Sequence, residues 1–164
     1  MTDSLSPGKN DISLAEWALV DEIHAGKWTN LDFPRIARED FNLNGIEFVN
    51  TLFGVPTLEY LKTLKQRIAE YGVSPLLIMV DDEGDACAGT KEERRQFVAA
   101  HRKWVDIAYF LGCHAIRTNC RGPQTVDKAE ALNWSAESYN MLLEYSRPSG
   151  ISILIEDHGG LSDD

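Results

Sequence analysis

The feature that most constrains this chain is a series of short apolar segments that recur with helical segments between them. Leu76-Leu-Ile-Met-Val80 is continuously apolar, and so is Ile151-Ser-Ile-Leu-Ile155 apart from its serine. Continuous rather than alternating apolar residues are typical of a parallel strand that is covered on both faces. We predict five strands, at residues 12–19, 45–50, 76–80, 113–119 and 151–156. For the first segment, a strand that runs into a short helix is the alternative.

The segments between these strands have the spacing and the boundary residues of helices. Apolar residues between Leu58 and Tyr71 recur at steps of three and four, which marks one buried helix face. Thr90 and Glu93 form a capping box that begins the next helix, and Gly112 is expected to end it. Strands that alternate with helices imply a parallel sheet with right-handed crossovers.

Two architectures place helices between parallel strands, and the sequence favours a barrel. A doubly wound sheet usually has a glycine-rich phosphate loop after its first strand, and no such motif follows Leu19. A (β/α)8 barrel needs about 250 residues, so these 164 would end a little past half way. We therefore predict an α/β fold, a partial (β/α)8 TIM barrel of about five βα units with parallel strands in the order 1-2-3-4-5. Residues 1–10 are expected to be a disordered lead-in, and residues 11–164 the N-terminal part of the barrel.

The net charge and the cysteines argue against several classes of protein. A formal net charge of −10 disfavours binding to nucleic acid, which needs clustered Lys and Arg, and to an anionic membrane surface. Cys87, Cys113 and Cys120 form no CxxC pair, and their odd number argues against a disulfide scaffold or a structural zinc site. The chain starts without the apolar stretch of a signal peptide, so we expect a cytoplasmic protein with reduced thiols.

One carboxylate stands out because of its position. Functional residues of parallel α/β folds collect at the carboxyl ends of strands, and Glu156 ends an apolar strand that we expect to be buried. An ionised carboxylate there needs a metal, a cation or hydrogen-bond donors, and its oxygens suit magnesium or manganese. His158 offers a further metal ligand, a contact with a substrate, or a hydrogen bond to a residue that binds the metal. The alternative is a structural Glu paired with an Arg from a neighbouring strand.

Other polar residues at the predicted strand ends leave two interpretations each. Trp17 is either a wall for a ring-shaped ligand or core packing, and Glu47 either makes a structural hydrogen bond or contributes to a pocket. Arg117 and Asn119 suit a phosphate or hydroxyl groups, but an ion pair inside the barrel, for example with Glu47, fits at least as well. We interpret the acidic run at residues 81–85 as a solvated loop that caps the next helix.

Five segments carry a family resemblance: ISLAEWAL, NLDFPRIAREDFNLNGIEFVN, LLIMVDDEGD, FLGCHAIRTNCRG and ILIEDHGGLS. In this order they resemble the sugar phosphate isomerase/epimerase family, the xylose isomerase-like group of barrels that also contains endonuclease IV-type enzymes. The resemblance covers nearly the whole chain from Ile12 to Ser162, and GIEFVN and IEDHGG are its most specific parts.

The resemblance implies a barrel with a divalent metal (Mn, Mg, Co or Zn) at the carboxyl ends of its strands. Members of the epimerase type hold the metal with a Glu, an Asp, a His and a Glu from strands five to eight, and only the first maps onto this chain, at Glu156. Glu156 is then a metal ligand and also the catalytic group that moves a proton beside a carbonyl. Trp17 and His158 are expected to line the sugar pocket, and Glu47 to support it.

Three departures from the family pattern affect this expectation. Asn42 stands where a Gly is usual, which is tolerable because Asn adopts the same left-handed conformation. The usual Glu-Asn-His is Glu156-Asp157-His158, which adds a negative charge near the site. The strands that carry the other three metal ligands are absent from the 164 residues.

These observations lead to three hypotheses about function. The first is that the parent protein is a divalent-metal-dependent isomerase or epimerase of a sugar or sugar phosphate, and that the 164-residue chain alone is inactive. The alternative is a non-catalytic half-barrel that self-associates or binds a partner through the open edges of the first and fifth strands. A metal-dependent phosphodiester hydrolase ranks last, because a net charge of −10 makes DNA a poor partner.

Overall fold

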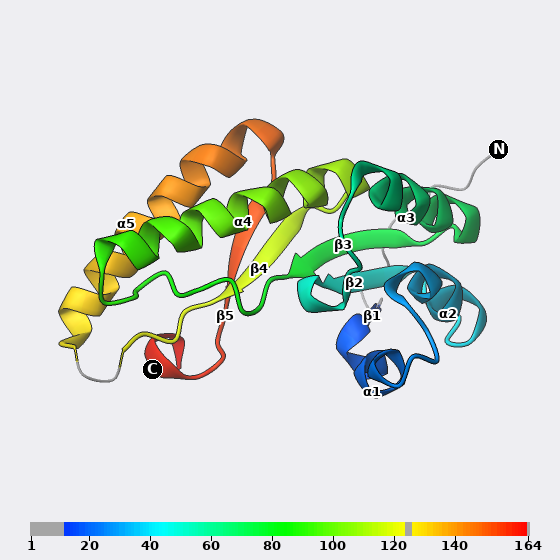
Figure 1. The fold of residues 1–164 in the computed structure, drawn as a ribbon, viewed down its shortest axis with the longest axis horizontal. Coiled ribbons are helices and arrows are strands. Elements are labelled where there is room, and N and C mark those ends of the chain that lie inside the picture. The colour runs from blue at the N-terminus through cyan, green and yellow to red at the C-terminus, as the bar shows by residue number, and fades with distance from the viewer. Residues whose placement is uncertain (1–11, 124–125, 164) are drawn as a thin grey trace.

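The computed structural model describes residues 12–123 and 126–163, and these form a five-stranded parallel sheet with helices between the strands (Figure 1). The strands are β1 (Ser13–Ala15), β2 (Gly45–Val49), β3 (Ser74–Met79), β4 (Ala115–Asn119) and β5 (Ser152–Glu156). Each strand pairs with the next in parallel, in the order β1-β2-β3-β4-β5. The predicted fold class and strand order are therefore confirmed. The lead-in predicted for residues 1–10 lies outside the described residues.

The helices follow the strands in alternation. They are α1 (Val20–His24), α2 (Phe33–Glu39), α3 (Leu58–Tyr71), α4 (Lys91–Leu111) and α5 (Lys128–Ser146), with 3₁₀ turns η1 (Glu16–Leu19), η2 (Asn30–Asp32), η3 (Asn50–Leu52), η4 (Arg147–Ser149) and η5 (Gly160–Ser162). The first strand is shorter than predicted, because the chain turns at Glu16 and enters η1 and α1. Within the described residues, no helix has the length and apolar character needed to cross a bilayer.

Local capping sets the helix boundaries where the sequence placed them. Thr57 and Thr90 accept backbone N–H bonds at the starts of α3 and α4, and Thr90 belongs to the predicted capping box. Gly72 and Gly112 end these two helices in the left-handed conformation that glycine adopts without steric cost. Asn42 is also left-handed, with φ 54°, as expected where the family has Gly.

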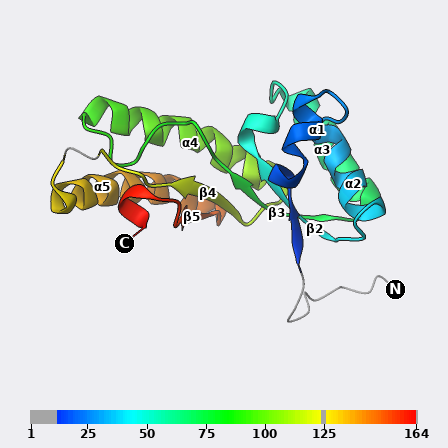
Figure 2. The same ribbon diagram turned by 90° about the horizontal axis from the view of Figure 1, so that it is seen from below.

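One face of the sheet is covered by helices and contains the core. Consecutive helices from α2 to α5 pack against one another, and Figures 1 and 2 show them along the curved sheet. Alternate strand residues point toward these helices and are buried in one apolar cluster with the helix residues Leu64, Phe97 and Trp104. The strand members of this cluster are Leu14, Ile46, Phe48, Ile78 and Ile116.

The opposite face carries the other alternate residues and is less covered. Leu154 is 40% exposed, and Ile155, on the helix-facing side of the same strand, is 51% exposed. The prediction that the fifth strand is buried is therefore wrong. The physical reason is that β5 is an edge strand: among the described residues, only β4 pairs with it, and no helix packs beyond it.

Candidate active site

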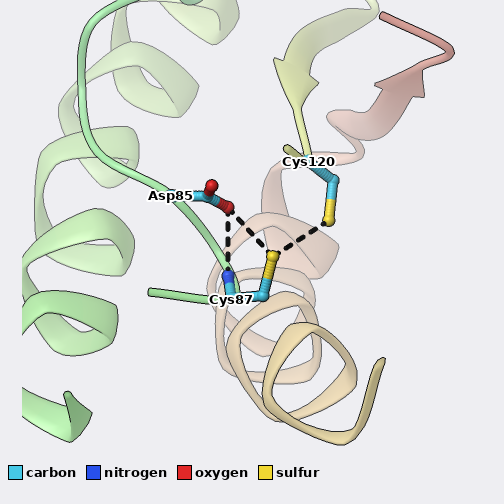
Figure 3. Close-up of side chains that lie close together, drawn as sticks. All are labelled: Asp85, Cys87 and Cys120. Carbon is cyan, nitrogen blue, oxygen red and sulfur yellow. Dashed lines mark hydrogen bonds between the residues drawn. The ribbon is translucent and has the colours of Figure 1, made fainter. Parts of the chain in front are cut away.

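The acidic run after β3 is more ordered than a solvated loop. Asp81 accepts hydrogen bonds from Arg117 and Asn119, at 2.7 Å and 2.6 Å from its Oδ1. Asp85 lies against Cys87 and Cys120, and its Oδ1 accepts the Cys87 backbone N–H at 3.1 Å (Figure 3). The interpretation of residues 81–85 as a solvated loop is therefore wrong for these two aspartates, because the next strand brings polar partners to them.

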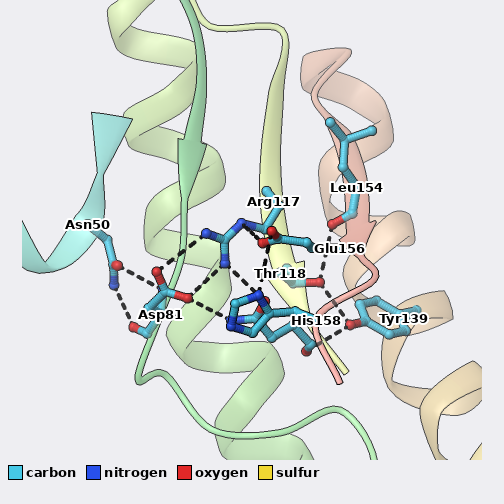
Figure 4. A network of polar contacts seen from close by, with 9 residues as sticks. Asn50, Asp81, Arg117, Thr118, Tyr139, Leu154, Glu156 and His158 are labelled. Atoms are coloured by element: carbon cyan, nitrogen blue, oxygen red, sulfur yellow. Dashed lines mark hydrogen bonds and ion pairs between the residues drawn. The ribbon is translucent and has the colours of Figure 1, made fainter. Parts of the chain in front are cut away.

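Arg117, on the less covered face of β4, connects the ends of three strands (Figure 4). Its Nη1 donates to Asp81 Oδ1 at 2.7 Å, and its Nε lies 2.8 Å from Glu156 Oε2. The side chain is only 11% exposed, so the two carboxylates replace most of the water around its charge. The predicted ion pair is present, but its suggested partner was wrong: Glu47 instead accepts a hydrogen bond from Ser13 Oγ at 2.6 Å.

Asn50 holds the end of β3 in place for this ion pair. Its Nδ2 donates to the Asp81 carbonyl oxygen, and its Oδ1 accepts the Asp81 backbone N–H, both at 2.8 Å. Figure 4 shows Asn50 on the far side of Asp81 from Arg117. Since one side chain satisfies both backbone groups, the position of the Asp81 carboxylate depends little on the loop that follows.

Glu156 lies at the carboxyl end of β5, opposite Asn119 in the strand register. Its side chain is 39% exposed, but Oε2 is buried and has no directional hydrogen bond, although Arg117 Nε is near it. Oε1 lies 3.6 Å from His158 Nδ1. The structure thus brings Glu156, His158 and Arg117 together, with Oε2 in an ion pair with Arg117 and Oε1 next to His158.

A hollow of about 580 Å³ opens beside this group. Trp17 and His158 line it, whereas Glu47 and Glu156 are not among its lining residues. Its other walls come from the loop after β3, from α4 and from the β4 end: Val80, Asp81, Asp82, Gly84, Asp85, His101, Arg117, Asn119 and Arg121. A hollow with an aromatic side chain and many hydrogen-bonding groups suits a small polar ligand.

Glu16 is a buried carboxylate to which the sequence reasoning assigned no role. It is 0% exposed, accepts hydrogen bonds from Asn30 Nδ2 (2.8 Å) and from the Val49 N–H (2.9 Å), and precedes Trp17 in the chain. Burial raises its pKa from 4.5 to about 7, although both hydrogen bonds act in the opposite direction. Its sequence signal was weak, because Glu16 fell inside the strand predicted for residues 12–19. Its contacts tie η1 to the end of β2 and so hold Trp17 at the pocket.

The arrangement can bind a small polar molecule and can move a proton. The pocket offers carboxylate, guanidinium, amide and imidazole groups, and Glu156 and His158 are a carboxylate and an imidazole of the kind that serve in general acid–base catalysis. Around Glu156, the described residues provide no set of three metal donors; such a set occurs only at Asp85, Cys87 and Cys120.

Comparison with known proteins gives a family and a fold. The family model described as xylose isomerase-like TIM barrel matches residues 36–163. No curated protein matches the chain. The solved structures that it resembles include a putative xylose isomerase from Rhodospirillum rubrum, with 14% identity, a TM-score of 0.70, and coverage of 88% of this chain and 52% of that one.

Two further solved structures have a similar degree of likeness. A D-psicose 3-epimerase with D-tagatose from Clostridium cellulolyticum H10 has 14% identity and a TM-score of 0.64, over 75% of this chain and 45% of that one. The IolI protein with a bound zinc atom has 15% identity and a TM-score of 0.67, over 89% of this chain and 51% of that one. The chain thus spans about half the length of the structures that it matches.

Proposed function

Since the chain belongs to the xylose isomerase-like TIM barrel family, we propose that the protein containing it is a divalent-metal-dependent isomerase or epimerase of a sugar or sugar phosphate. The observation that carries the proposal is the place of Glu156, which ends β5 beside a polar hollow, with one carboxylate oxygen paired to Arg117 and the other next to His158. The relatives named as a D-psicose 3-epimerase and a putative xylose isomerase support the same class of substrate.

In the proposed catalytic site, Glu156 is the residue of this chain that would hold the divalent ion, and His158 is near enough to assist it. Both carboxylate oxygens of Glu156 are hard donors, and the imidazole of His158 lies beside Oε1. A bound divalent ion would supply a Lewis acid that polarises a carbonyl. Arg117 Nε, at 2.8 Å, competes with a cation for Oε2, so Oε1 is the better placed of the two oxygens.

The remaining residues have roles that follow from their positions. Glu156 takes a proton from the carbon beside a substrate carbonyl, and the returning proton determines which isomer forms. Trp17 provides a flat wall for the sugar ring, and His158 a hydrogen bond to a hydroxyl group. Arg117 orients the Glu156 carboxylate, since it is itself anchored by Asp81. Glu47 contributes indirectly through its bond to Ser13.

The test compares the 164-residue chain with the complete reading frame that contains it. Each is incubated in D₂O with manganese and with D-fructose or D-tagatose, and proton NMR follows epimerisation and loss of the proton beside the carbonyl. We expect turnover only with the complete protein, and we expect Glu156→Gln to lower kcat by roughly 10³-fold. Glu144→Gln is the matched control, because Glu144 is exposed on α5 and lies outside the hollow. Full activity of Glu156→Gln would refute the assignment, and turnover by the short chain would refute its expected inactivity.

A second candidate function is self-association of two copies of this chain. Its support is the free edge of β5 together with the exposed Leu154 and Ile155, because unpaired strands and apolar side chains favour pairing with a second copy. Light scattering after size-exclusion chromatography distinguishes the two outcomes. A dimer that Ile155→Lys converts to a monomer would support this candidate, and a stable monomeric wild type would contradict it.

A further inference from the structure

Asp85, Cys87 and Cys120 form a cluster that the proposed function does not use (Figure 3). Cys87 Sγ lies 3.7 Å from Cys120 Sγ and 3.1 Å from Asp85 Oδ1. The three donor atoms all lie within 4.8 Å of one another. Cys87 comes from the loop before α4 and Cys120 from the end of β4, so the sheet register unites two thiols that are 33 residues apart. The missing CxxC pair and the odd number of cysteines predicted no structural zinc site, but neither feature detects thiols that distant segments bring together.

Neighbouring groups hold each of the three side chains in position. The Asp85 carboxylate accepts the backbone N–H groups of Cys87, at 3.1 Å, and of Gly122, at 2.8 Å. Ser135 Oγ lies 3.2 Å from Cys120 Sγ. A Cβ atom at Gly122 would lie 3.2 Å from Cys87 Sγ, so glycine allows the backbone to pass close to this thiol. Hydrogen bonds and close packing of this kind orient the residues that bind the metal in known metal sites.

We propose that Asp85, Cys87 and Cys120 bind a thiophilic divalent cation of the zinc class, with a non-protein molecule as the fourth ligand. A Zn–S bond of about 2.3 Å places two sulfur ligands of a tetrahedral site about 3.8 Å apart, and the observed separation of the sulfur atoms is 3.7 Å. Two sulfur donors also favour such a cation over magnesium or calcium. This site is separate from Glu156 and does not rest on the proposed function.

Metal binding exchanges two thiol protons for the cation. Both sulfur atoms become thiolates, both protons leave to solvent, and with the Asp85 carboxylate the three ligands carry three negative charges that the cation partly neutralises. Cys120 is the more readily ionised thiol, because the hydrogen bond from Cys87 and the contact with Ser135 lower its pKa. The Cys87 thiol is held protonated by Cys120 and Asp85, which raise its pKa, so the cation must displace that proton.

The test is a titration of the reduced 164-residue chain with Co²⁺ under anaerobic conditions. We expect a thiolate-to-cobalt charge-transfer band and tetrahedral d–d bands that saturate at one Co²⁺ per chain and disappear when Zn²⁺ is added. Cys87→Ser, Cys120→Ser and Asp85→Asn should each weaken binding at least about tenfold. Cys113→Ser is the matched control, because Cys113 is also buried and lies outside the cluster. Cobalt bound at Glu156 gives no thiolate band, so the readout separates the two sites.

The possible outcomes each decide the proposal. A wild-type chain that is folded by circular dichroism and gives no charge-transfer band overturns it, even if the cysteine variants fail to fold. Equal binding by Cys87→Ser and the wild type also overturns it. Loss of two free thiols from both wild type and Cys113→Ser in parallel samples exposed to air, with oxygen as the oxidant and no cobalt band in the reduced sample, would identify Cys87 and Cys120 as a disulfide-forming pair instead of metal ligands. A cobalt band that is lost in both cluster variants and retained in Cys113→Ser supports it.

Discussion

The buried carboxylate of Glu16 makes the stability of the chain depend on pH in a direction that can be calculated. Its pKa is about 7 in the folded chain and 4.5 as the reference for the unfolded chain. Below pH 4.5 both states are protonated, and the stabilising contribution is fully present. Between the two pKa values the unfolded state releases its proton first, so the free energy of unfolding falls as the pH rises. Above about pH 7 the contribution is lost.

The magnitude follows from the same two pKa values. A difference of 7 − 4.5 corresponds to an upper bound of about 3.4 kcal/mol. Between pH 5 and pH 8 the expected loss of unfolding free energy from Glu16 is about 2.5 kcal/mol. His101 acts in the opposite direction, because burial lowers its pKa and the unfolded state then binds the extra proton below pH 6.5. A direct comparison of wild type across pH would therefore mix two effects.

The variant Glu16→Gln isolates the contribution of Glu16. It keeps the size of the side chain but has one acceptor oxygen in place of two, so it loses one of the bonds from Asn30 and Val49, at a pH-independent cost of about 1 kcal/mol. Urea unfolding of both proteins at pH 5, 6, 7 and 8, followed by circular dichroism, gives the difference in unfolding free energy. His101 is present in both and cancels.

We expect the wild type to lose about 2.5 kcal/mol relative to Glu16→Gln between pH 5 and pH 8, mostly below pH 7. The reasoning would be refuted by a difference that stays constant within about 0.5 kcal/mol over this range. That result would mean that Glu16 is ionised in the folded chain at pH 5, with water or a cation near it that the burial of its side chain does not suggest.

Two further predictions concern the carboxyl end of the sheet. Arg117→Met removes the cation between Asp81 and Glu156, and we expect it to lower the unfolding free energy by about 2 kcal/mol at pH 7 in a urea titration; an unchanged midpoint would contradict this. Gly160→Ala should expose the backbone of η5 to hydrogen exchange much more than Gly159→Ala, because an added Cβ at position 160 would overlap the carbonyl oxygen of Arg121, whereas position 159 has open space. Both glycines have positive φ, and Gly159 also has ψ 170°, so alanine is strained at either position; equal exchange rates would contradict the steric argument.

Most of the fold could be predicted because its signals are local. The starts of α3 and α4 depend on Thr57 and Thr90, which bond to backbone groups three residues away, and their ends depend on Gly72 and Gly112. The error at β5 has the opposite origin. The apolar composition of a strand predicts burial, but what covers a strand depends on its neighbours, and β5 has only β4 beside it in the described chain.

The candidate site could be predicted only in part. Glu156, His158 and Trp17 were identified from their places at strand ends, and an Arg from a neighbouring strand was the stated alternative partner of Glu156. Which particular residues would pair with one another was not predictable. Asp81 was assigned to a solvated loop, Glu47 was suggested for Arg117, and Glu16 was given no role. Each of these outcomes depends on which strand residues stand opposite one another.

The sequence by itself determined the alternation of strands and helices, the helix ends and the residue types at the strand ends, because these depend on interactions within one or two turns of chain. Only the tertiary structure decided which of those residues meet. Arg117 and Asp81 are 36 residues apart, and the thiols of Cys87 and Cys120 are 33 apart. Such contacts are set by parallel strand register and by the loops that follow it, which no local pattern in the sequence specifies.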